Sequence, residues 1–143
     1  MKAAFLFFLL SCLSIQAQTS KPNTPIVSSN ATISKFHTID ELSNMGKGDL
    51  INIYKERFKV LTYLLPYSAL TTKPGTTLKD LGIPENGENK SLIEKENKAA
   101  ADLEKAVNTS LENFIAYADK NNIIWSILFY EEMIRKLMIG KEY

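Results

Sequence analysis

Histidine and cysteine are almost missing from this sequence. One of each occurs in 143 residues, His37 and Cys12. Zinc, haem and copper sites need several such ligands, and a di-iron helical bundle needs Glu-x-x-His pairs, so none of these centres fits within one chain. Nucleophilic catalysis by Ser or Cys needs a neighbouring base, for which only His37 is available. We therefore expect no metal or other cofactor, and we interpret His37 as an ordinary polar linker residue.

An excess of charge of either sign is also absent. The chain carries 17 Lys and Arg residues against 16 Asp and Glu residues. A balanced chain has no electrostatic reason to seek nucleic acid or an anionic membrane surface. The glycine-rich signatures of phosphate-binding loops do not occur either. We therefore expect no nucleic-acid partner.

No apolar run is long enough to cross a membrane as a helix, which takes about 20 residues. The most apolar run, residues 3–10, follows the positively charged start Met1–Lys2 and precedes the small residue Ala17. A charged start, a short apolar stretch and a small residue at the exit make a secretory signal peptide. We expect cleavage after Ala17, so that residues 1–17 are removed and the mature chain is periplasmic or secreted.

Cys12 allows a second route of processing. The sequence Leu9-Leu10-Ser11-Cys12 resembles a bacterial lipobox, in which the cysteine receives a lipid and becomes the first mature residue. The resemblance implies a protein anchored by lipid in the cell envelope, and only in that case do we expect contact with a membrane. Either route leaves no disulfide within one chain.

Polar residues dominate the sequence that follows. Residues 18–36 are rich in Ser, Thr, Asn and Pro. Such a composition has too few apolar side chains to hold itself folded, so we expect a flexible polar tether. A tether suits a lipid anchor and a free N-terminus equally, and it leaves both processing routes open.

Helical periodicity fills most of residues 37–143, which we expect to form one all-α domain. A capping box at Thr38 opens a short first helix. Apolar residues then recur at three- and four-residue spacing over 49–65, 91–118 and 123–139. Three long amphipathic helices with short accessory ones predict a helical bundle.

Two further details belong to the same prediction. The second long helix opens with a capping box at Ser91. Before it, residues 66–90 form a long connection that contains several Leu and Ile side chains. A connection of this length is uncommon in a compact domain. Because its apolar side chains would be wasted in solvent, we expect it to pack over the bundle.

The last helix carries more apolar side chains than one buried stripe needs. Aliphatic residues form one arc, and a second arc holds Trp125, Phe129, Tyr130 and Met133. Two interpretations stay open. The helix is either central and buried on both arcs, or it presents the second arc to a partner or a second copy, since aromatic residues and Met are enriched in interfaces.

The acidic residues of the predicted helices alternate with Lys and Arg. Glu131 with Arg135, and Glu132 with Lys136, have the i,i+4 spacing of exposed ion pairs. The alternation favours solvated helix faces. Acid–base catalysis nevertheless needs only two well-placed carboxyl groups, so a carboxylate-based hydrolase is one alternative.

These observations predict a non-enzymatic exported helical protein. We expect it to bind an envelope protein, or a second copy of itself, through the second arc of the last helix, which requires Trp125 or Phe129 to be exposed in the isolated domain. A carrier of a small apolar ligand is an alternative and needs an enclosed apolar pocket. The hydrolase needs two carboxyl groups close together in a cleft, one with a raised pKa.

Overall fold

A computed structural model describes residues 24–138, and every regular element among them is helical. The prediction of an all-α chain is confirmed for this part of the sequence. The predicted signal peptide, Cys12 and both processing sites lie outside the described residues. No helix within residues 24–138 is both long and apolar enough to span a membrane.

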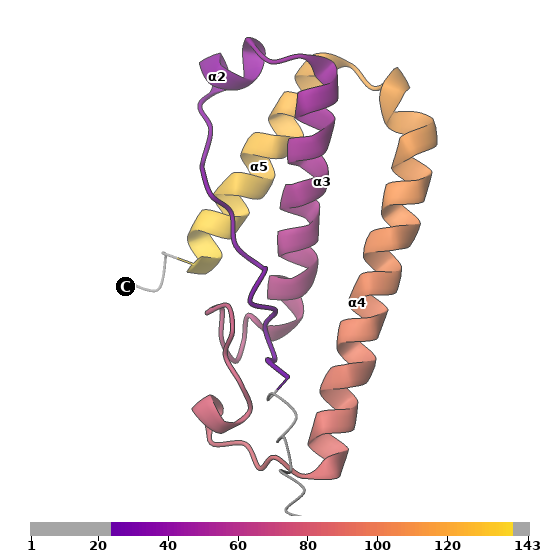
Figure 1. Cartoon of the computed structure of the whole chain (residues 1–143). Helices are drawn as coiled ribbons and strands as arrows, with labels where there is room; N and C mark the ends of the chain where they lie inside the picture. The colour runs from indigo at the N-terminus through magenta and orange to yellow at the C-terminus, as the bar shows by residue number, and fades with distance from the viewer. Residues whose placement is uncertain (1–23, 139–143) are drawn as a thin grey trace, which may run out of the picture.

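Three helices make up most of the molecule: α3 (Lys47–Leu64), α4 (Gly87–Phe114) and α5 (Lys120–Met138). α3 stands between the other two (Figure 1). α5 packs against α3 along much of its length, whereas α4 contacts α3 along a thinner stripe and makes no extensive contact with α5. The bundle is therefore open between α4 and α5.

The short helix α2 (Ile39–Ser43) begins at the predicted capping box. The Glu41 N–H donates to Thr38 Oγ1 at 3.3 Å, and the Thr38 N–H donates to Glu41 Oε2 at 2.9 Å. Leu42 is buried in a cluster with Leu50 of α3 and the first turns of α5. The capping box thus fixes the chain where it enters the bundle.

Residues 24–36, here called the N-terminal segment, are not a tether. Ile26, Val27 and Ala31 are buried in the same cluster as Leu64 of α3 and Ile134 of α5. The segment also pairs with the connection after α3. The Ile26 N–H donates to the Thr76 carbonyl at 2.7 Å, and the Gly75 N–H donates to the Val27 carbonyl at 2.9 Å. The prediction of a flexible tether is wrong for these residues, because a few well-placed apolar side chains suffice to dock them.

The connection between α3 and α4 packs over one end of the bundle, as expected. It contains two short 3-10 turns, η1 (Leu65–Tyr67) and η2 (Lys79–Leu81). Leu78 is buried in the core, and Leu81 and Ile83 pack against it. Gly75 has φ of 81° in a turn of this connection, which suits glycine because it adopts positive φ without strain.

α4 begins one turn earlier than predicted. Its N-cap is Asn86, whose side chain accepts the Asn89 N–H at 2.8 Å, so Ser91 lies inside the helix. Asn caps a helix at least as well as Ser, and α4 begins at the capping residue that comes first in the chain. At 1.5 Å per residue the 28 residues of α4 extend about 42 Å, yet Ile93 is its one buried residue.

α5 begins at Lys120, three residues before the predicted start. The Asn121 N–H in its first turn donates to Asp119 Oδ1 at 2.7 Å. Its buried residues face α3 and α2. They are Ile123, Ile124, Ile127, Glu131 and Ile134. The predicted ion pair of Glu132 with Lys136 is present at 3.6 Å, but Glu131 is buried and does not pair with Arg135. The guanidinium of Arg135 instead lies 4.5 Å above the Phe36 ring.

Candidate functional site

Two aromatic side chains of α5 lie open to solvent. Trp125 is 65% exposed and Phe129 is 48% exposed. Their rings stack, with centroids 5.4 Å apart and planes inclined by 4°. The second arc of the helix is thus uncovered at these positions, contrary to the interpretation of a helix buried on both arcs. A stacked pair of this size in solvent is costly unless something covers it.

The other two residues of the predicted face are half-buried. Tyr130 packs against Tyr54 of α3, with ring centroids 5.3 Å apart and hydroxyl oxygens separated by 3.2 Å. Burial, together with the Tyr54 hydroxyl, raises the pKa of Tyr130 to about 12. Met133 packs at the edge of the core. Tyr130 and Met133 therefore anchor the arc to the bundle, while Trp125 and Phe129 extend from it.

A groove runs between α4 and α5 with α3 as its floor. It encloses about 410 Å³ beside Phe129, and its lining is almost entirely apolar. The floor and walls come from all sides of the opening: Phe58, Leu61 and Leu65 below, Leu103 on α4, and Phe129 and Met133 on α5. We call this the α4–α5 groove. It places part of the predicted face inside a concave apolar surface.

The α4 wall contains residues that the sequence reasoning did not single out as a binding surface. Leu92, Leu103 and Phe114 are exposed, Leu103 by 50% and Phe114 by 70%. They recur every 11 residues, close to three full helical turns, so they lie along one line of the helix. Small residues lie near that line between them, including Ala99 and Ala106. The 11-residue spacing was the signal in the sequence for this exposed line. It was missed because the apolar residues of this helix were interpreted only through their three- and four-residue spacing.

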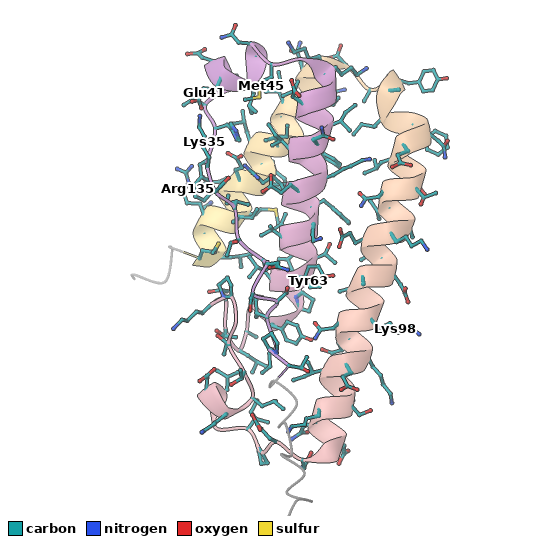
Figure 2. All side chains as sticks on the ribbon, in the orientation of Figure 1. Lys35, Glu41, Met45, Tyr63, Lys98 and Arg135 are labelled. Carbon is teal, nitrogen blue, oxygen red and sulfur yellow. The ribbon has the colours of Figure 1, made fainter. Side chains whose placement is uncertain are left out.

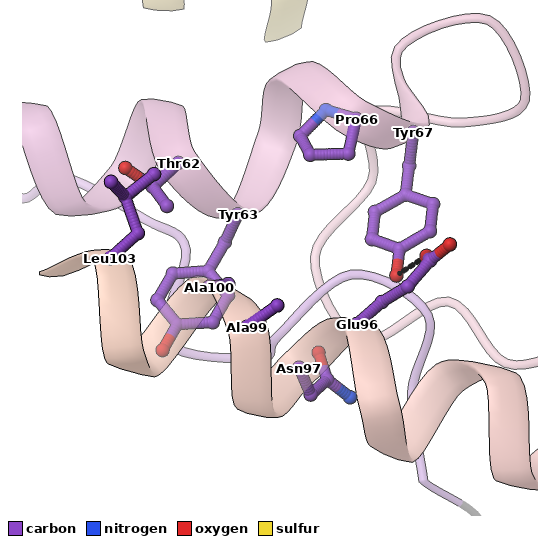
Figure 3. Close-up of a pocket in the computed structure, with 9 residues that line it drawn as sticks. All are labelled: Thr62, Tyr63, Pro66, Tyr67, Glu96, Asn97, Ala99, Ala100 and Leu103. Atoms are coloured by element: carbon purple, nitrogen blue, oxygen red, sulfur yellow. Dashed lines mark hydrogen bonds between the residues drawn. The ribbon is translucent and has the colours of Figure 1, made fainter.

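Two smaller hollows also border α4. One, of about 250 Å³, lies toward the connection between α4 and α5 and includes Phe114 and Ser126. The other, also about 250 Å³, lies between the end of α3 and α4 and shares Leu103 with the groove (Figure 3). Both are smaller than the ~300–1,000 Å³ of usual small-ligand pockets. Both hollows are open to solvent, whereas the carrier hypothesis requires an enclosed pocket.

Figure 3 shows the polar edge of the second hollow. The Tyr67 hydroxyl donates to Glu96 Oε2 at 2.6 Å, and Tyr63 lies against the alanines of α4. Burial, reinforced by the Glu96 carboxylate, raises the pKa of Tyr67. This hydrogen bond ties the first half of α4 to η1, and half-exposed Leu103 lies at the edge of the hollow.

A buried charged cluster fixes the position of α5 against α3. Arg57 is 1% exposed and Glu131 is 2% exposed. Arg57 Nε–H donates to Glu131 Oε1 at 2.9 Å, and Arg57 Nη2 donates to the Lys35 carbonyl at 2.7 Å. Glu56 Oε2 lies 2.7 Å from Arg57 Nη1, at an angle poor for a hydrogen bond. The cluster crosses from α3 to α5 within the core.

His37 belongs to this cluster and is not a linker residue. Its backbone N–H donates to Glu131 Oε2 at 2.6 Å, and its Nδ1 lies 2.8 Å from Glu131 Oε1. The Glu131 carboxylate on α5 is therefore contacted both by Arg57 of α3 and by His37 in the stretch before α2. Just outside, Lys35 pairs with Glu41 at 2.7 Å (Figure 2). These contacts hold the N-terminal segment on the face of α5 that is turned away from Trp125 and Phe129.

The carboxyl groups give the hydrolase hypothesis no support. Glu41 and Asp80 are the two carboxyl groups with a clearly shifted pKa among residues 24–138, and both pKa values are lowered. No three His, Asp or Glu side chains in that part of the chain converge in the geometry of a metal site.

The fold and the groove together define a small helical domain with an open apolar surface. Comparison with protein-family models, curated proteins and solved structures gives no match for this chain.

Proposed function

We propose that this chain is an exported, non-enzymatic protein that works in the cell envelope by binding a helix of a protein partner in the α4–α5 groove. The main observation behind this proposal is the exposed stacked pair of Trp125 and Phe129, in which Phe129 lines an apolar groove. The signal peptide predicted for residues 1–17 supports export.

The shape of the groove favours a helix as the bound element. The groove has an apolar floor on α3 and walls from α4 and α5, which is the kind of surface that an amphipathic helix fills in helix-in-groove recognition. Helices pack at axial distances of about 8–10 Å, so a helix lying on α3 contacts α4 and α5 together. Such a helix completes the fourth position of a bundle.

The chemistry of the rim favours a protein over a polar ligand. Aromatic residues and Met are enriched in protein interfaces, and aromatic side chains bury large apolar areas when they are covered. Two ion pairs join α3 to α4, one between Lys59 and Glu104 at 3.1 Å and one between Lys55 and Glu112 at 3.4 Å. The groove itself offers few polar atoms for orienting a small polar molecule.

A photo-crosslinking amino acid at position 129 tests the proposal in the protein's own host. We expect irradiation to give one defined protein adduct, identified by mass spectrometry. The matched control carries the same amino acid at Lys98, which extends from the outer side of α4 away from α3 (Figure 2). No adduct at 129, or the same adducts from both positions, contradicts the proposal.

A further inference from the structure

The exposed line on α4 has a symmetry that points to its partner. Leu92 and Phe114 lie equally far from Leu103, 11 residues on either side. Ala99 and Ala106 lie near the line on either side of Leu103, four residues before it and three residues after it. Two such helices laid antiparallel bring Leu103 against its own copy and Leu92 against Phe114 of the other chain. This arrangement is self-complementary, as a twofold interface must be.

We propose that a second copy of this chain fills the α4–α5 groove, with the two α4 helices antiparallel about Leu103. The inference rests on the proposed function and names its partner. Each α4 then lies in the groove of the other copy and covers Phe129 there. Small residues near the line, Ala99 and Ala106, allow the two helix backbones to approach closely.

The exposed area fits this assembly. An aromatic side chain buries about 150–250 Å² when fully covered, so the exposed parts of Phe114, Trp125 and Phe129 leave roughly 350 Å² uncovered together. Leu92, Leu103 and the groove floor add to that area. A stable interface buries about 800 Å² per partner, so the aromatic side chains alone supply a large part of it.

The charge balance does not oppose self-association. The formal net charge of the chain is +1, and removal of Lys2 with a signal peptide brings it near zero. Two copies therefore repel each other little, whereas a strongly charged domain resists pairing with itself. The same balance gives no electrostatic preference for a partner of either charge.

Sedimentation equilibrium of the full chain, as its host exports it, tests the assembly. We expect a dimer at micromolar concentration, and Leu103→Glu raises its dissociation constant by about tenfold or more because a carboxylate is then buried at the axis. Ile39→Glu is the matched control, since Ile39 is exposed on α2 and lines none of the hollows. A monomer at tens of micromolar overturns the inference.

A cysteine scan tests the register without depending on Leu103→Glu. With Cys12 replaced by Ser, Leu103→Cys should form an intermolecular disulfide on mild oxidation, because the two copies of position 103 meet at the axis. Lys98→Cys should not. Equal cross-linking at both positions, or none at 103, overturns the antiparallel pairing.

The two proposals fail in distinguishable ways. A photo-adduct at position 129 with the chain's own mass supports both. An adduct with a different protein, from a chain that sediments as a monomer, leaves the groove as a binding site and overturns the second copy as its occupant.

Discussion

Arg57 and Glu131 set the largest single-residue effect that we expect. Breaking a buried ion pair leaves an uncompensated charge, which costs about 3–5 kcal/mol. We therefore expect Arg57→Met to lower the free energy of unfolding by about that amount in urea. The double variant Arg57→Met with Glu131→Leu should lose less than Arg57→Met alone, because no charge is then stranded.

The exposed pair of Glu132 with Lys136 is the control for this cycle. Its side chains are largely in solvent, so Lys136→Ala should cost no more than about 1 kcal/mol. If the double core variant is as unstable as the sum of its two single variants, the pair is not coupled and the cluster is described wrongly.

Glu41 gives the chain a defined pH response. The Lys35 ammonium, together with the Thr38 N–H, lowers the pKa of Glu41 from 4.5 to about 2. A carboxyl group with a lowered pKa stabilises the fold above its ordinary pKa and loses that contribution as the pH falls through the folded value. We expect Glu41→Ala to lower Tm at pH 7, and the difference from the parent protein to shrink between about pH 4.5 and about pH 2.

Thr38→Ala separates this titration from the cap itself. Thr38→Ala removes the hydroxyl that caps the Glu41 N–H but keeps the two larger causes of the lowered Glu41 pKa, the Lys35 ammonium and the backbone N–H of residue 38. It should therefore lower stability by about 1 kcal/mol with little difference between about pH 7 and about pH 2.5. A Glu41→Ala difference that stays constant down to pH 2.5 would contradict the assigned pKa.

His37 marks the limit of prediction from single residues. Its neighbours in the sequence include both polar and apolar residues, and nothing local distinguishes it from a linker residue. Its partner Glu131 lies 94 positions away. Local sequence pattern carries no information on such a long-range contact, so the contact between His37 and Glu131 could not be predicted from it.

α4 should be the least protected of the three long helices. Only Ile93 is buried among its 28 residues, whereas α3 and α5 each bury five. Helices with few buried contacts open by local fluctuation. In hydrogen exchange at concentrations that keep the chain monomeric, we expect α4 amides to exchange well before those of α3 and α5. Protection of α4 equal to that of α5 in the monomer would falsify this expectation.

Helix positions followed from periodicity, but helix ends did not. The stripes over 49–65, 91–118 and 123–139 correspond to α3, α4 and α5. Each of these three helices begins a few residues earlier than predicted. For α4 the reason is that the sequence offers more than one capping residue and local pattern does not rank them. Ser91 and Asn86 illustrate this, since both are good caps and only the second is used.

The N-terminal segment separates two descriptions of the whole molecule. If residues 24–36 are part of the core, Ile26→Ala should cost roughly 2–5 kcal/mol in urea unfolding, as for other buried isoleucines. Thr32→Ala, at an exposed position of the same segment, should change stability by less than about 0.5 kcal/mol. Equal, small effects would restore the flexible tether.

The amino-acid composition of residues 18–36 led to the wrong prediction of a flexible tether for residues 24–36, and the reason is physical. Its average is polar, and an average does not show that Ile26, Val27 and Ala31 are spaced to meet the open end of the bundle. The all-α class came from periodicity within each helix. The gap between α4 and α5 depends on how helices are arranged, and no helical stripe encodes that arrangement by itself.

The docking of Ile26 on the bundle also limits how far the folded domain can lie from Cys12. An extended chain advances at most about 3.3–3.6 Å per residue, so the 14 residues from Cys12 to Ile26 span no more than about 50 Å. A tether lasting to residue 36 would reach far further. If Cys12 carries a lipid, the domain stays within about one α4 length of the membrane surface, and only partners presented in that thin layer of the envelope come within reach of the groove.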